Sequence, residues 1–383
     1  MCECKSDKYL FAPKTRKDLK YLVRVSDIDL GSIDTSQITD MSALFKGSKR
    51  KDFSGIEKWD VSNVVSMRAM FYGAKFFNHP LDSWDVSNVT DMNCMFRKAK
   101  SFNQPLKSWD VSNVISMYGM FYKAKSFNQA LESWNVHNVL YMGSMFRRAK
   151  SFNQPLESWN VGNVVDMSYM FSGALAFNQP LESWNVSNVT NMRGMFDCAE
   201  SFNQPLNAWD VSSVTDMNSI FSLTNFNQPL NEWNVSKVMD MSFMFNGVSN
   251  FNQPLDSWDV RNVKDMGAMF QGAVSFNQSL ASWNVGNVTD MSAMFLDARS
   301  FNQPLESWNV SNVTDMGWMF LNAHTFNQPV DSWDVSNVED MWLMFSDAID
   351  FNQSLESWNV SKVKVMCGMF GGSGQKILPR WYS

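Results

Sequence analysis

Pairs of methionines spaced M-x-x-M are the residues of this sequence best suited to bind a soft metal, because thioethers are ligands for Cu(I). They recur twelve times, from Met67 and Met70 to Met366 and Met369. Each pair shares its segment with a Phe and a Val, and Ile220 replaces the second Met in one copy. A packing position tolerates that exchange, whereas a metal ligand does not. The pattern therefore favours methionines that fill a core.

Repeated Asp residues raise a second possibility, a pair of carboxylates that cleaves a glycosidic bond. They occur at two fixed positions, directly after Trp and directly before Met. An active site is normally a local departure from a repeat, and no copy gathers Asp, Glu, His or Lys in that way. We therefore predict a protein that is not an enzyme and has no catalytic residues. A sugar-active enzyme on a parallel solenoid is the alternative.

The five Cys and three His have no metal-ligand spacing, so we predict neither a disulfide framework nor a structural metal, and no cofactor. Sequons such as those at Asn88, Asn188, Asn287 and Asn312 recur with the repeat, and we interpret them as by-products of it.

The segments that position these residues repeat along the chain. Trp recurs from Trp59 to Trp358 in steps of 25 residues, with a single step of 24. Thirteen copies cover residues 59–370, and a degenerate copy precedes them at residues 33–45. The copy reads W-[DN]-V-S-x-V-x-x-M-x-x-M-F-x-x-A-x-x-F-N-Q-P-L-x-S.

Two spacings alternate within a copy. Trp308 and Val310 alternate with polar residues, as in a short strand. The apolar residues of segment 313–323 fall at offsets of three, six, seven and ten, which predicts a helix of two to three turns. One strand and one helix cannot bury their apolar edges alone, so the copies must stack. We therefore predict an α/β repeat solenoid, with short parallel strands on one face and short helices on the other.

A solenoid needs covered ends. Thr15 followed by Asp18 resembles a capping box and predicts a helix there. We therefore divide the chain into an N-terminal capping segment at residues 1–32, a solenoid at residues 33–370 and a C-terminal capping tail at residues 371–383.

Charge is the one feature that does not repeat. Residues 1–150 hold 23 Lys and Arg against 15 Asp and Glu, whereas residues 151–383 hold 9 against 23, so the net charges are +8 and −14. The positive excess lies just after the Met/Phe segment, where stacking would align it into a basic stripe. The stripe consists of Lys75, Arg97, Lys98, Lys100, Lys123, Lys125, Arg147, Arg148 and Lys150.

Three interpretations of the basic stripe remain open. It is a solvated face, a binding site for an anionic surface ligand, or one half of a head-to-tail contact with the acidic rear of another copy in a virion or filament. Nucleic acid is a weaker partner, because the chain is acidic overall and has no recognition motif.

The position after Trp is always Asp or Asn and forms a second candidate surface, a polar strand face for a protein or glycan. The candidate residues are Asp85, Asp110, Asn135, Asn160, Asn185 and Asp210. The alternative is that these side chains solvate the surface or bond along the stack.

No run approaches the roughly 20 apolar residues of a membrane span, and the first residues form no apolar secretory segment. We therefore expect no membrane span, and a cytoplasmic or virion-associated location.

Runs such as FNQSLASWNVGNVTDMSAMF, residues 276–295, resemble the BspA-like leucine-rich repeats, in particular the surface-protein repeat known as domain of unknown function 285. The resemblance covers residues 33–370. It implies a right-handed, LRR-like stack of about thirteen coils, and a non-enzymatic, adhesin-like or structural protein that presents an extended surface to a protein or surface ligand. The head YLFAPKTRKDLKYLVRV, residues 9–25, is similar to versions of the repeat encoded by large DNA viruses.

Overall fold

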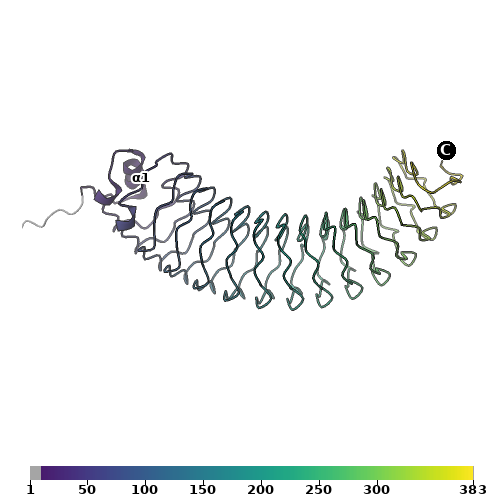
Figure 1. Cartoon of the computed structure of the whole chain (residues 1–383), viewed down its shortest axis with the longest axis horizontal. Coiled ribbons are helices and arrows are strands. Elements are labelled where there is room, and N and C mark those ends of the chain that lie inside the picture. The colour runs from purple at the N-terminus through teal and green to yellow at the C-terminus, as the bar shows by residue number, and fades with distance from the viewer. Residues whose placement is uncertain (1–9, 383) are drawn as a thin grey trace, which may run out of the picture. The chain divides into compact units, whose positions relative to one another are not determined.

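The computed structural model describes residues 10–382 and divides into two compact units, Met1–Pro180 and Leu181–Ser383. Each unit is a repeat solenoid of coils that follow one another in chain order (Figure 1). The elements of the first unit are α1 (Arg16–Arg24), η1 (Leu30–Ser32) and η2 (Ile56–Lys58). No helix among residues 10–382 has the length and apolar character needed to cross a membrane.

Helix α1 begins at the position that the sequence predicts. The Thr15 hydroxyl accepts the N–H of Asp18 at 3.2 Å, and the same hydroxyl donates to the Asp18 carboxylate at 2.7 Å. The side chains of Leu19 and Val23, on one face of the helix, are buried. The Arg16 guanidinium, which is three residues before Leu19 and so on the same face of the helix, donates to the Ser42 carbonyl oxygen at 3.1 Å. These contacts fix α1 against the first coil.

The helix predicted in each repeat is not confirmed, because segment 67–74 folds as consecutive turns. The N–H groups of Met67 and Ala69 donate to the carbonyl oxygens of Asp91 and Asn93 in the following coil, at 2.9 and 2.8 Å. In an α-helix these groups would bond within the segment. Ala69 has a φ of +54°, the sign that the third residue of a type II turn requires. Successive turns point the same apolar residues inward as a helix would.

The strand predicted around each Trp is not confirmed either. Among residues 10–382 the coils pair through single-residue parallel bridges directly before the first Met, as between Asp91 and Ser116. At Trp109 the chain turns instead, because its backbone N–H bonds to the Leu106 carbonyl oxygen at 3.1 Å. The indole Nε1 donates to the Leu81 carbonyl oxygen of the preceding coil at 3.0 Å. Trp therefore joins neighbouring coils through its side chain.

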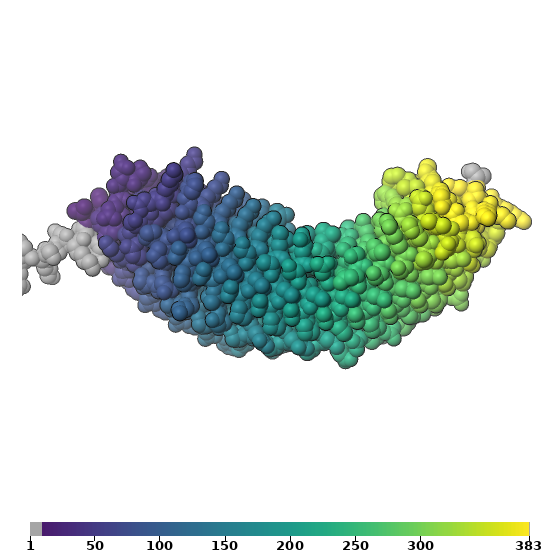
Figure 2. Space-filling model, viewed as in Figure 1, coloured from purple at the N-terminus to yellow at the C-terminus, as the bar shows by residue number. Residues whose placement is uncertain are grey.

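The core of each unit consists of columns of like side chains. In the first unit the rings of Trp134 and Trp159 lie 6.3 Å apart and within 3° of parallel. In the second unit Trp283 and Trp308 stack in the same way at 6.5 Å. The methionine pairs lie in this interior, except that Met366 of the last coil is half-buried, and Ile220 is as fully buried as the Met residues whose position it takes. Figure 2 shows the outer surface that the successive coils of each unit form around these columns.

Amide side chains of the F-N-Q motif form a second column. Asn103 Oδ1 accepts the backbone N–H of Asn128 at 2.9 Å and the Nε2 group of Gln129 at 3.1 Å. An equivalent pair of bonds reaches Asn277 in the second unit. The motif is therefore a coil-to-coil hydrogen-bond ladder.

The sequon asparagines also join coils. Nδ2 of Asn88 donates to the Ser62 carbonyl oxygen at 2.7 Å, and Nδ2 of Asn287 donates to the Arg261 carbonyl oxygen at 2.7 Å. The amide nitrogen that a glycan would modify thus has a structural partner in each case.

Candidate functional site: a basic face on the first unit

The basic stripe lies entirely on the first unit, where coil-to-coil hydrogen bonds align its members. The N–H of Lys98 donates to the Tyr122 carbonyl oxygen at 2.7 Å, and the N–H of Lys123 donates to the Arg147 carbonyl oxygen at 2.8 Å. The position directly after the Ala of the repeat holds a lysine in four successive coils, and all four are exposed. They are Lys75, Lys100, Lys125 and Lys150.

Tyrosines interleave with the arginines of the stripe. The Arg97 guanidinium lies 4.3 Å from the centroid of the Tyr122 ring and 5.5 Å from that of Tyr72. The Arg147 guanidinium lies 4.1 Å from the centroid of the Tyr169 ring and 5.9 Å from that of Tyr122. Such contacts stabilise a cation without neutralising it. The rings therefore hold both arginines in place while their charge remains.

Sequence reasoning missed these tyrosines. The signal was present, because Tyr72 and Tyr122 occupy the same position of the repeat as Arg97 and Arg147. An alternating column of aromatic and cationic residues was therefore readable from the aligned copies.

The stripe carries a net positive potential. Among residues 10–382 none of its nine members forms an ion pair with a carboxylate. The Nε atoms of Arg97 and Arg147 are buried and have no hydrogen-bond partner within that range. Although burial opposes it, the pKa of the Tyr122 phenol is lowered by the neighbouring Lys123, Arg147 and Arg148. The arrangement can therefore attract an anion.

The candidate polar strand face is divided between the two units. Its four members from Asp85 to Asn160 lie in the first unit, whereas Asn185 and Asp210 lie in the second, and all six are exposed. Each carboxylate or amide oxygen accepts a backbone N–H two residues further on, as Asp85 does from Ser87 at 3.0 Å. Because the Ser87 hydroxyl and N–H both donate to it, the pKa of Asp85 lies below its usual range. These side chains therefore shape the turn after each Trp.

The second unit carries an acidic column directly before the first Met of each repeat. Six aspartates that pair with one another through parallel bridges in successive coils form this column: Asp216, Asp240, Asp265, Asp290, Asp315 and Asp340. Arg193 reaches the carboxylates of Asp216 and Asp240 at 3.3 and 3.5 Å. Burial raises the pKa of Asp265 and of Asp315, and the neighbouring carboxylates raise it further. The two units thus carry opposite charge.

Comparison with known proteins gives one family. A family model described as a Mycoplasma protein of unknown function, DUF285, matches residues 17–134, 116–225, 222–320 and 279–377. These matches together span residues 17–377. No curated protein matches the chain.

Two solved structures resemble the chain weakly. The crystal structure of a TLR13–ssRNA13 complex matches 89% of this chain with 10% identity and a TM-score of 0.23, and the chain spans 57% of that protein. A leucine-rich repeat protein of Leptospira interrogans matches 92% of this chain and 99% of its own length, with 8% identity and a TM-score of 0.20.

Proposed function

This chain belongs to the DUF285 family of repeat proteins, and from that premise we propose that it is a non-enzymatic binding scaffold whose first unit holds an extended polyanion. The ligand class is a linear polymer that carries sulfate or phosphate groups, of the kind present on cell surfaces. The basic stripe is its site.

The column of exposed lysines carries this proposal. Lys75, Lys100, Lys125 and Lys150 occupy one position in successive coils of the first unit. Neighbouring backbones in a parallel ladder lie about 4.8 Å apart. This spacing is well below the Debye length of about 10 Å at 0.1 M salt, so the four charges act together on an extended anion. A compact anion would reach few of them.

Retention on a heparin column tests the proposal. Replacing Lys100, Lys125 and Lys150 by Glu should move elution to clearly lower salt, because each replacement reverses one exposed charge of the column. The matched control reverses three exposed lysines of the second unit, Lys237, Lys264 and Lys376, and so changes the net charge equally. Equal retention of the two triple variants would refute a localised site.

A second candidate function is head-to-tail assembly, and the acidic column of the second unit favours it. The basic stripe of one copy and the acidic column of another are complementary in sign. Sedimentation at low and high salt tests this function. Oligomers that dissociate as salt is added are expected, and a monomer at every salt concentration would refute it.

A further inference from the structure

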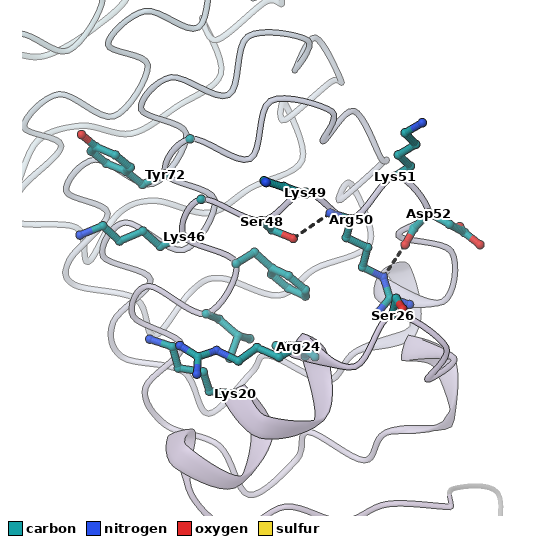
Figure 3. A pocket seen from close by; sticks show the side chains of 15 residues that line it. Lys20, Arg24, Ser26, Lys46, Ser48, Lys49, Arg50, Lys51, Asp52 and Tyr72 are labelled. Carbon is teal, nitrogen blue, oxygen red and sulfur yellow. Dashed lines mark hydrogen bonds between the residues drawn. The ribbon is translucent and has the colours of Figure 1, made fainter.

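A second cationic feature lies where α1 meets the first coils. A cavity of about 890 Å³ opens there, and its floor is formed by the buried side chains of Val23, Leu44 and Phe45. Its rim contains Lys20 and Arg24 from α1, Lys46 and Lys49 from the first coil, and Tyr72 from the next (Figure 3). None of these cations belongs to the basic stripe.

The cavity has a fixed frame. Arg50 donates to the carbonyl oxygens of Val25 and Ile28, at 3.3 and 2.6 Å, and to that of Asp52. It therefore ties the segment after α1 to the loop after the first coil. Because its donors are engaged by backbone oxygens, Arg50 is a structural residue of the pocket.

Four cations of the rim have no counter-charge. Among residues 10–382 no carboxylate forms an ion pair with Lys20, Arg24, Lys46 or Lys49. The one carboxylate that lines the cavity, on Asp52, accepts the N–H and the hydroxyl of Ser54.

These cations are close enough to repel one another. Lys20 is half-buried, and its pKa is lowered first by that burial and then by Arg24, Arg16 and Lys46. In Figure 3 the side chains of Lys20 and Arg24 extend toward the same side as Lys46, whereas Lys51 points away. An anion placed between Lys20, Arg24 and Lys46 would relieve this repulsion.

We propose that this pocket binds a compact anion carrying at least two phosphate groups. A phosphate monoester carries about −1.5 to −2 charges at neutral pH, so two of them balance the four cations. Arg24 offers the planar fork that binds phosphate oxygens in pairs, and the lysines add mobile ammonium donors. The half-buried Lys20 strengthens the interaction because water screens it less.

Calorimetric titration of the full chain with tripolyphosphate tests the proposal. The wild-type chain should bind one equivalent. The double variant Lys20→Gln/Arg24→Gln should bind at least about tenfold more weakly, and Lys46→Gln, which leaves α1 intact, should weaken binding as well. The control Lys237→Gln/Lys264→Gln removes two exposed lysines of the second unit and should bind as the wild type does. No binding by the wild type, or an equal loss in the control, would overturn the proposal.

A second arm separates two sources of the same phosphate chemistry. Sedimentation with vesicles that contain a phosphatidylinositol bisphosphate, abolished in the Lys20→Gln/Arg24→Gln variant, assigns the pocket to a lipid headgroup. Tripolyphosphate binding without vesicle binding assigns it to a soluble polyphosphate.

The pocket adjoins the basic stripe, because Lys46 and Lys98 both lie over the Tyr72 ring, at 5.2 and 5.4 Å from its centroid, but Lys100, Lys125 and Lys150 do not line it. The Lys100, Lys125 and Lys150 triple variant should bind tripolyphosphate as the wild type does, even though it elutes early from heparin. If that variant loses tripolyphosphate binding as fully as the pocket variant, a general attraction between charges explains both results and the pocket assignment fails.

Discussion

The asparagine ladder gives the most specific test of the stacked coils. Asn128 Oδ1 accepts the backbone N–H of Asn153 at 2.9 Å and the Nε2 group of Gln154 at 3.0 Å. Asn128→Ala removes the acceptor of both bonds. A hydrogen bond of this kind contributes about 0.5–1.5 kcal/mol net, so the pair contributes about 1–3 kcal/mol.

The loss of stability should appear in the coil that follows the substituted one, because the two donors lie there. Amide hydrogen exchange measured by mass spectrometry should show faster exchange at Asn153, by a factor of about 5 to 150 if the whole free energy acts on local opening. The amide of Asn128 should keep its protection, because its own acceptor on Asn103 is unchanged. Local exchange is the right measurement, since it reports the opening of a single coil rather than of the whole array.

Asn128→Asp is the matched control, because a carboxylate keeps an acceptor at the same place. It should leave Asn153 protected. Unchanged exchange at Asn153 in Asn128→Ala, or faster exchange confined to the mutated coil, would refute the ladder.

Three other predictions address backbone, core and charge. Leu223 has a φ of +55°. Leu223→Gly should change the free energy of unfolding in urea by less than about 0.5 kcal/mol, because the strain that glycine releases offsets the chain entropy that it adds. Leu223→Val should lower that free energy by about 1–2 kcal/mol, because a β-branched residue fits a positive φ poorly. Trp134→Phe leaves the Leu106 carbonyl oxygen without its indole donor at 2.9 Å, and should cost about 1–3 kcal/mol in the same assay. Asp265→Asn and Asp315→Asn should raise the melting temperature at pH 7, because burial raises the pKa of both carboxyls and the ionised form is therefore unfavourable in the folded chain.

The sign of the last prediction sets its pH dependence. A carboxyl whose pKa is raised by folding contributes stability at low pH and loses it as the pH rises through the folded pKa. The gain from the Asn variants should therefore vanish below the ordinary Asp range, about pH 3.9. A gain that is equal at low and neutral pH would contradict the burial argument. An unchanged free energy of unfolding in Trp134→Phe would contradict the role of the indole hydrogen bond. Equal stability of Leu223→Val and Leu223→Gly would contradict backbone strain at Leu223.

Residue spacing predicted the register and the core of the repeats. Trp, Met and Phe recur at fixed offsets, and they lie buried in columns of like side chains, except that Met366 of the last coil is half-buried. Spacing did not separate turns from a helix, because both place the third, sixth and seventh residues inward. A clue lay in the glycines. Gly119 and Gly194 directly precede the second Met of their copies, and both have positive φ, which glycine adopts readily.

The candidate sites were partly readable. The basic stripe follows from charge and register alone. The pocket beside α1 does not, because it depends on the angle at which the helix meets the first coil. Arg50 fixes that angle through its hydrogen bonds to the carbonyl oxygens of Val25 and Ile28. Residue spacing in the sequence does not predict such contacts.

The turn ladder makes each unit directional. In the four coils of the first unit that begin at Met67, Met92, Met117 and Met142, several N–H groups point toward the following coil, so their dipoles add, unlike the alternating dipoles of an ordinary sheet. The two ends of the ladder therefore differ in partial charge, as the ends of an α-helix do, with carbonyl oxygens outermost at the N-terminal end. Arg16 binds one of these oxygens, on Ser42, so the cationic helix α1 matches the negative pole that it covers.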